Sequence, residues 1–302
     1  MQLISFWRKS GCLLMLLIPL MGMGAVWADN KPSSSVESVD SKVHRAVALW
    51  KKGGRDDLKE SWRLLQEAAK VKDPDAEYNL GIMNMNGQGV TKNDKEAAYW
   101  YKRAAESGHP LAQYNLAIML ENGQGIPNND IEAAKWYRAA ANSGHILAAY
   151  NLGVMYLDGR GVVRSDKEAF SYFQLSANQG YMLGKYNLGM MYLEGSGVNK
   201  DAGKAVSLFH AAAEQGVPES NYMLAYCYLN GLGVSVDYGN ALKFFEKGAK
   251  LNDAESKYML GYMYAKGLGV KRDHTKAVYW VKAAAAQGYS KALAYMNAIK
   301  SE

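Results

Sequence analysis

The groups with the clearest chemical precedent are six Gly-x-Gly pairs, because glycine-rich turns bind phosphate through backbone N–H groups. The pairs begin at Gly87, Gly123, Gly159, Gly195, Gly231 and Gly267. A dinucleotide site needs a strand before the glycines and a helix that starts on the last of them. A helical pattern precedes every pair here, so the spacing favours a turn over a nucleotide site.

Histidine is the second candidate, since it serves both as a metal ligand and as a general base. His109 and His145 occupy equivalent places in adjacent segments, but Tyr181 stands there in the next segment. No cysteine or acidic cluster completes the three or four ligands that a zinc site takes. The other three histidines are solitary. We therefore expect neither a metal nor a cofactor.

Catalysis by a nucleophile is also poorly supported. No serine or cysteine has a recognisable base beside it. Acids such as Asp94 and Asp130 recur at predicted helix starts, where the helix dipole explains them without catalysis. Cys227 has no disulfide partner once a segment containing Cys12 is removed, so we interpret it as a small buried apolar residue. The sequence predicts a protein that is not an enzyme.

The composition is that of a folded protein with a modest positive charge. Of 302 residues, 49% are hydrophobic and 21% are charged, which excludes disorder and collagen. The formal charge of +6 arises from 35 basic and 29 acidic residues scattered along the chain. A surplus so small and so dispersed predicts no binding to nucleic acid.

The N-terminus has the three parts of a secretory signal peptide. Arg8 and Lys9 precede an uncharged apolar run over residues 11–24, and small residues flank a cleavage point after Ala28. The run is shorter than the roughly 20 residues that span a bilayer. We expect residues 1–28 to be removed on export to the periplasm or the exterior, leaving no stable membrane span. The alternative is an uncleaved signal that tethers the protein to the membrane.

A repeat of 36 residues fills the remainder of the chain. Its most regular column is tyrosine, without insertion or deletion, at Tyr78, Tyr114, Tyr150, Tyr186, Tyr222 and Tyr258. Each copy has two apolar stripes with helical spacing: Ala76, Leu80 and Met83 trace a first helix, and Ala97 and Ala104 trace a second. Neither helix buries its stripe alone, so successive pairs must stack on one another.

Capping residues mark the helix boundaries within the repeat. A polar residue suited to N-capping precedes each second helix, at Asn93, Asn129, Ser165, Asp201, Asp237 and Asp273. Each second helix is expected to close at a glycine such as Gly108. Glycine in the middle of a first helix, as at Gly81, costs about 1 kcal/mol relative to alanine. It therefore predicts close packing of the two helices of a pair.

The repeat resembles the Sel1-like repeat, a relative of the tetratricopeptide repeat. The resemblance rests on A-E-Y-N-L-G at residues 76–81, N-G-Q-G-V at 86–90 and E-A-A-Y-W-Y-K-R-A-A-E-S-G at 96–108. It implies an all-α, right-handed α-solenoid of about seven helix-turn-helix repeats that serves as a scaffold for protein contacts. Such proteins often act in bacterial envelope, secretion or host-interaction systems.

The register divides the chain after the signal peptide into four parts. We expect a flexible polar leader at residues 29–41, a degenerate N-terminal capping repeat at 42–75, and a C-terminal capping helix at 289–302. Between the two caps lie six repeats, at 76–111, 112–147, 148–183, 184–219, 220–255 and 256–288.

An enzymatic alternative comes from the same resemblance. A cysteine-rich secreted branch of the family is associated with β-lactam binding or hydrolysis, which suggests a β-lactamase-like or cell-wall hydrolase. This sequence lacks the paired cysteines of that branch. A non-enzymatic scaffold that binds a peptide or amphipathic helix of another protein is therefore the favoured hypothesis, with the oligomeric state left open.

The partner is expected in the concave groove, if the first helices line it as in tetratricopeptide relatives. The position after the repeating tyrosine would then face the groove, and it holds Asn79, Asn115, Asn151 and Asn187. Their amides could hydrogen-bond an extended peptide, or equally brace neighbouring helices. Further along, Tyr226 and Tyr262 would make the groove more aromatic, unless they serve only in helix packing.

Overall fold

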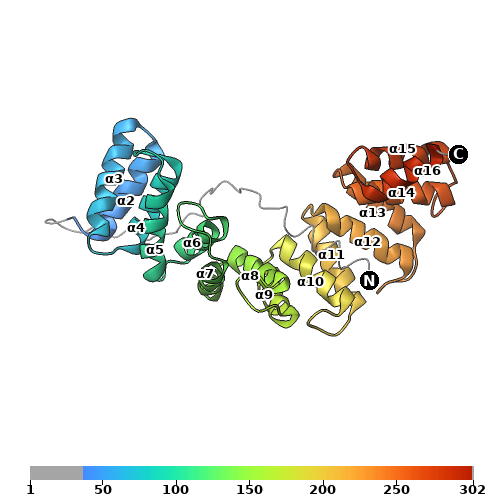
Figure 1. The fold of residues 1–302 in the computed structure, drawn as a ribbon, viewed down its shortest axis with the longest axis horizontal. Coiled ribbons are helices and arrows are strands. Elements are labelled where there is room, and N and C mark those ends of the chain that lie inside the picture. The colour runs from blue at the N-terminus through green and yellow to red at the C-terminus, as the bar shows by residue number, and fades with distance from the viewer. Residues whose placement is uncertain (1–36, 301–302) are drawn as a thin grey trace. The chain divides into compact units, whose positions relative to one another are not determined.

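The computed structural model describes residues 37–300, so the expected signal peptide and most of the expected leader lie outside it. This part of the chain folds into 15 α-helices without a strand, which confirms the all-α prediction (Figure 1). In chain order they are α2 (Val39–Lys52), α3 (Arg55–Ala69), α4 (Pro74–Asn86), α5 (Asp94–Glu106), α6 (Pro110–Asn122), α7 (Asp130–Asn142), α8 (Ile146–Asp158), α9 (Asp166–Asn178), α10 (Met182–Glu194), α11 (Ala202–Glu214), α12 (Pro218–Asn230), α13 (Tyr238–Lys250), α14 (Ala254–Lys266), α15 (His274–Ala285) and α16 (Ser290–Lys300). None of these helices is both long and apolar enough to span a bilayer.

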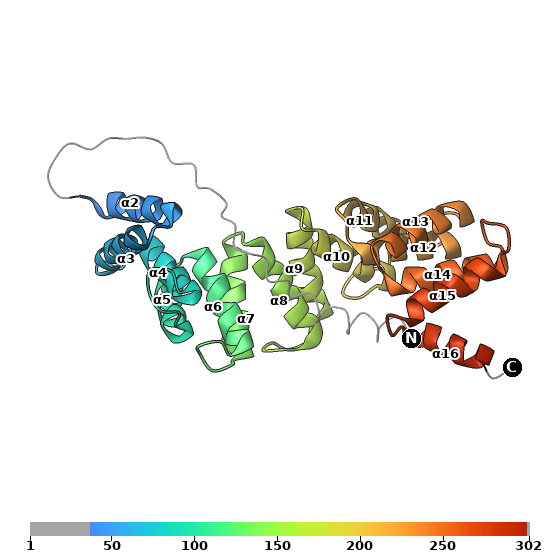
Figure 2. The same cartoon turned by 90° about the horizontal axis from the view of Figure 1, so that it is seen from above.

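The helices form two compact units that divide after Arg164. Unit 1 holds α2 to α8 and unit 2 holds α9 to α16. Within each unit every helix packs against the helices before and after it in the chain, as Figures 1 and 2 show. Packing that is mainly between sequence neighbours, with first helices of consecutive repeats such as α12 and α14 also in contact, is the arrangement of an α-solenoid.

The helix starts agree with the capping pattern of the sequence. All six predicted N-caps of the second helices accept a backbone N–H bond at the start of their helix, as at Asn129, where the Glu132 N–H lies 3.1 Å from Oδ1. The N-terminal described helix, α2, begins at Val39 because the Ser38 hydroxyl caps its start. The last residues of the expected leader, 39–41, are therefore helical.

The Gly-x-Gly pairs end the first helices, which confirms that they are turns. The first glycine of each pair closes its helix in the left-handed conformation; Gly123, for example, has φ 66°. The second glycine lies against the preceding repeat. At Gly125, an added Cβ would stand 2.1 Å from the carbonyl oxygen of Asp94, the first residue of α5. The left-handed backbone of the first glycine and the close approach at the second therefore explain both glycines without a bound phosphate.

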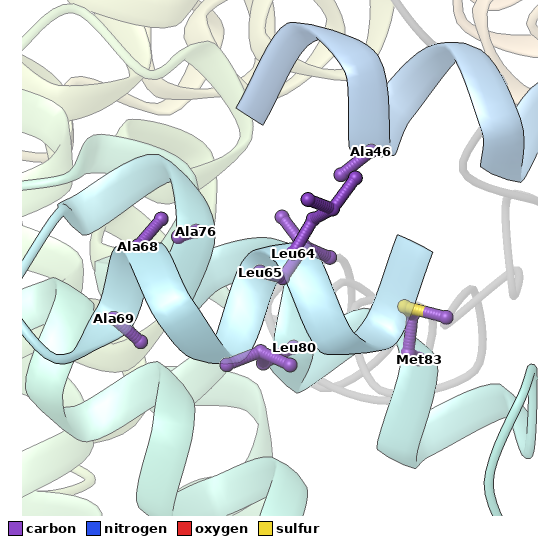
Figure 3. Packing of buried hydrophobic residues seen from close by; sticks show 8 residues of the cluster. All are labelled: Ala46, Leu64, Leu65, Ala68, Ala69, Ala76, Leu80 and Met83. Carbon is purple, nitrogen blue, oxygen red and sulfur yellow. The ribbon is translucent and has the colours of Figure 1, made fainter. Parts of the chain in front are cut away.

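Close packing within the helix pairs is also confirmed. A Cβ on Gly81 of α4 would stand 2.5 Å from the Tyr101 ring of α5, so the missing side chain makes room for the ring. In the N-terminal part of unit 1, alanine and leucine side chains of α2, α3 and α4 form one buried cluster, shown in Figure 3. Small residues bring the helices close, and the larger side chains fill the space between them.

Candidate partner-binding surface

The residue types that the sequence singled out for chemistry are a possible metal-ligand group, Cys227 and the two equivalent histidines. Between residues 37 and 300, no three His, Cys, Asp or Glu side chains lie close enough to hold a metal ion. Cys227 is free and fully buried, as the sequence predicted, and burial raises the pKa of its thiol to about 12. Burial and the raised pKa keep this thiol protonated near neutral pH, as in a structural cysteine.

The two equivalent histidines cap helices. The Ala112 N–H donates to Nδ1 of His109 at 3.1 Å, and the Ala148 N–H donates to Nδ1 of His145 at 3.2 Å. The His145 ring stacks on Tyr114 at 4.2 Å between ring centroids, and burial lowers its pKa to about 4. Each Nδ1 must stay unprotonated to accept its bond, so this structural role explains these residues.

The asparagine column lies largely inside the helix stack. Asn115 and Asn187 are only 6% and 7% exposed, and Asn79 and Asn151 are half-buried. The Asn79 amide donates to the Asp75 carbonyl of its own helix at 2.8 Å. The two buried amides have little surface to offer a partner in this structure.

The contacts of the asparagines support the bracing alternative. Asn115 of α6 lies beside the hydroxyl groups of Tyr78 and Tyr101, and Asn151 of α8 lies beside that of Tyr137. Tyr101 and Tyr137 belong to the second helix of the preceding pair, so each amide links consecutive pairs. Whether any of these amides also binds a partner stays a prediction.

The two tyrosines of the predicted site are accessible in unit 2. Tyr262 of α14 is 42% exposed. Tyr226 of α12 is half-buried and stacks on Tyr222, with 6.3 Å between the ring centroids. Half-exposed aromatic rings are typical of surfaces that bind proteins, because they bury large areas at low entropic cost.

Three carboxylates that the repeat pattern did not single out lie near Tyr186 and Tyr222 in unit 2. Glu219 stands in the first turn of α12, Glu255 in the first turn of α14, and Asp253 caps α14. The charges of all three act on the hydroxyl of Tyr186 in α10, and together with burial they raise its pKa. Residues from three successive first helices therefore share one region of unit 2.

Glu255 is the carboxylate of this region whose pKa is raised the most. Burial and the charges of Asp253 and Glu219 raise its pKa to about 7, although Lys291 and the nearby Tyr289 hydroxyl oppose the shift. Burial is also the main cause of the raised pKa of Glu219. A carboxylate half removed from water and placed among like charges favours its neutral form.

A signal for these glutamates was present in the repeat register. The same position of the repeat holds Asp75 in the first copy, leucine in the next three copies, at Leu111, Leu147 and Leu183, and glutamate in the last two, at Glu219 and Glu255. The change from leucine in the middle copies to glutamate in the last two marks a change in the surface that these first helices present.

Comparison with known proteins matches the repeat to one family. A family model described as the Sel1 repeat matches residues 74–109, 110–145, 146–181, 183–217, 218–253 and 254–289. Five of these six matches begin at the first residue of a first helix. The resemblance expected from the sequence is thereby confirmed. No curated protein sequence matches the chain.

Two solved structures are similar over most of the chain. One is a protective antigen present in uropathogenic Escherichia coli strains that displays an SLR fold, with 30% identity, a TM-score of 0.76 and coverage of 86% of this chain. This chain spans only 56% of the length of that structure. The other is a Sel1 repeat protein from Oxalobacter formigenes, with 32% identity, a TM-score of 0.67 and coverage of 80% of this chain and 96% of that one.

Proposed function

The chain belongs to the Sel1 repeat family, and from that premise we propose that it is an exported, non-enzymatic scaffold that binds a segment of another protein. The bound segment is a peptide or an amphipathic helix, and it lies on the first helices of the repeats. The function belongs to envelope, secretion or host-interaction processes. The partner-binding residues include Tyr226 and Tyr262.

The observation that carries this proposal is the exposure of aromatic rings on first helices in unit 2. A stack of helix pairs that buries Leu224 and Leu260 on one side of α12 and α14 leaves Tyr226 and Tyr262 accessible. Accessible tyrosines supply apolar contact and a hydroxyl for hydrogen bonding, which suits a peptide or helix better than a small metabolite.

Export rests on the N-terminal sequence pattern. Basic Arg8 and Lys9, the apolar run and the small residues Val26 and Ala28 support secretion with cleavage after Ala28. The mature protein would then act in the periplasm or outside the cell. Mass spectrometry of the protein from fractionated cells tests this: a mature chain that begins at Asp29 in an exported fraction supports the proposal, and an intact N-terminus in the cytoplasm contradicts it.

Binding is tested by photo-crosslinking of the full-length mature chain in cell-envelope extract. The test variant changes Tyr226 and Tyr262 to Ala. The matched control changes Tyr99 and Tyr279 to Ala, because these tyrosines are 51% and 63% exposed but lie on second helices, α5 and α15. Circular dichroism confirms equal helicity of all three proteins.

A protein captured by the parent and the control but lost with the test variant supports binding on the first helices. Equal capture by all three proteins, or loss with the control alone, assigns the interface to another surface and contradicts the proposal. Failure to capture any protein across independent extracts also counts against it.

A further inference from the structure

Unit 2 presents a surface that combines tyrosine rings with carboxylates. We use the name acidic tyrosine face for Tyr186, Glu219, Tyr222, Glu255 and Tyr289. The first four belong to the first helices α10, α12 and α14, and Tyr289 lies directly before α16. Figure 2 shows these helices following one another within unit 2.

The five residues form one surface, because electrostatic interactions and ring contacts connect them. Tyr186 is an electrostatic neighbour of both glutamates and of Tyr222. Tyr222 is in turn a neighbour of Glu255 and Tyr289. The Tyr289 ring packs on Tyr258 with 5.4 Å between centroids, and its hydroxyl reaches Glu255. All five members are half-buried, so they are confined by the fold and still reach the surface.

No ion pair among residues 37–300 neutralises the two glutamates. Neither Glu219 nor Glu255 forms an ion pair with another residue in the described range. Lys291 of α16 acts on Glu255 from a greater distance, and no described cation is a principal neighbour of Glu219. A half-buried carboxylate without a counter-charge is costly, and its position could hold leucine, as it does in three earlier repeats.

A metal ion does not fit this face. The carboxylates do not come together as a group of three potential ligands within the described residues. Two separated carboxylates among aromatic rings instead match organic cations, because a guanidinium or ammonium group pairs with the carboxylate while its stem and charge lie against a ring.

The tyrosines favour arginine over a bare ammonium. A planar guanidinium stacks on aromatic faces and binds a carboxylate through two parallel N–H groups. The glutamates occupy the same position of consecutive repeats, on α12 and α14, so a chain that runs across these helices meets both. This repetition suits a polypeptide with two basic side chains.

We propose that the acidic tyrosine face is a docking site for a basic, arginine-bearing segment of a partner protein. The inference rests on the proposed function and specifies the chemistry of the partner at one place in unit 2. One basic side chain of the segment pairs with Glu219 and another with Glu255, and the tyrosine rings cover their stems.

The test measures binding of a fluorescent nine-residue peptide of alternating arginine and glycine to the full-length mature chain at pH 8. The test variant is Glu219→Leu with Glu255→Leu, which installs the residue of the earlier repeats. The control is Glu106→Leu with Glu214→Leu, because both glutamates are exposed at the ends of second helices and give the same change in net charge. Glu219→Gln with Glu255→Gln serves if the leucine variant loses helicity.

The expected result is a dissociation constant at least tenfold weaker for the test variant and changed less than twofold for the control. An equal loss in both variants indicates non-specific attraction and overturns the inference, as does equal binding of a glutamate–glycine peptide. Competition by spermidine at the concentration of the arginine peptide identifies a polyamine site and also overturns it.

The outcome is separable from that of the proposed function. If the tyrosine variant of the crosslinking experiment loses its partner while the arginine peptide fails to bind, the first helices bind a segment of different chemistry and only this inference falls. If neither experiment shows binding, both fall together.

Discussion

Glu77 and Arg103 illustrate how single residues adjust to burial in this repeat. Glu77 is 1% exposed, and an Arg103 nitrogen lies 2.6 Å from its Oε1. Burial raises the pKa of Glu77, and the Arg103 charge opposes that shift. In the next repeat the equivalent positions hold Gln113 and Ala139, so acid and base are replaced together.

This correspondence predicts the effect of breaking the pair. Arg103→Ala should lower the free energy of unfolding by roughly 3 kcal/mol, because it leaves a buried carboxylate without its counter-charge. Adding Glu77→Gln should recover most of that loss, since the pair then matches the uncharged one of the next repeat. Urea denaturation of the two variants measures both effects. If Glu77→Gln brings no recovery, the loss stems from missing packing of the arginine stem.

At the scale of the helix and its turn, the Gly-x-Gly pair separates two costs of a side chain. Gly123 and Gly125 both have positive φ, but only Gly125 touches the preceding repeat. Gly123→Ala should cost about 1 kcal/mol, the strain of a left-handed alanine.

Gly125→Ala should cost roughly 3 kcal/mol, because its Cβ would also collide with the carbonyl of Asp94 and push the turn away from α5. Urea denaturation compares the two variants, and amide hydrogen exchange localises the damage. Faster exchange at the start of α5 is expected only in Gly125→Ala. Equal effects of both substitutions would mean that the turn does not depend on the contact.

The His145 cap makes the start of α8 sensitive to acid. The pKa of His145 is lowered to about 4 in the folded chain, against an ordinary value near 6.5. Between pH 6.5 and pH 4, His145 binds a proton in the unfolded chain but stays neutral in the folded chain. The contribution to stability is therefore complete above pH 6.5 and falls as the pH drops toward 4, by up to roughly 3 kcal/mol.

Hydrogen exchange of α8 measures this loss. Its amide protection should fall between pH 7 and pH 5 relative to that of α9, whose N-cap is the Ser165 hydroxyl and does not titrate. His145→Asp keeps a capping acceptor and should flatten the pH dependence of α8. A fall of equal size in both helices would point to a global effect of acid instead.

Helix positions were predictable from the sequence because capping chemistry is local. The side chains of Asn93 and its five counterparts cap the helix starts, and the glycines end the helices through their left-handed backbone. The orientation of Asn115 was not predictable from spacing alone. Its amide lies beside Tyr101 of the preceding pair, a contact that depends on how consecutive pairs pack. The glutamates of α12 and α14 were visible in the register, but their proximity to Tyr186 depends on the stacking of three helix pairs.

For the whole molecule, net charge is a poor guide to the partner. The chain carries a formal charge of +6, yet the acidic tyrosine face in unit 2 brings together carboxylates without close counter-charges. Charges separated by more than about 10 Å are largely screened at 0.1 M salt. A basic segment therefore responds mainly to the local carboxylates, and the distant surplus of lysine and arginine repels it only at low ionic strength.

Binding at this face should depend on pH because Glu255 has a pKa of about 7. The groups that act on it are Asp253 of its own helix, Glu219 of α12, Lys291 of α16 and the Tyr289 hydroxyl. A bound cation stabilises the charged carboxylate, so binding releases a proton where Glu255 is still protonated. Affinity for the arginine peptide should consequently rise from pH 6 to pH 8, by at most tenfold per pH unit for one proton.

Glu255→Gln isolates this effect from the titration of histidines elsewhere in the chain, which would change the affinity in the same direction. Calorimetry at pH 7 in two buffers of different ionisation enthalpy counts the protons released on binding. The parent should release a fraction of one proton, and Glu255→Gln should release less and bind with little dependence on pH. An unchanged pH profile in the variant would assign the titration to another group and separate Glu255 from the bound cation.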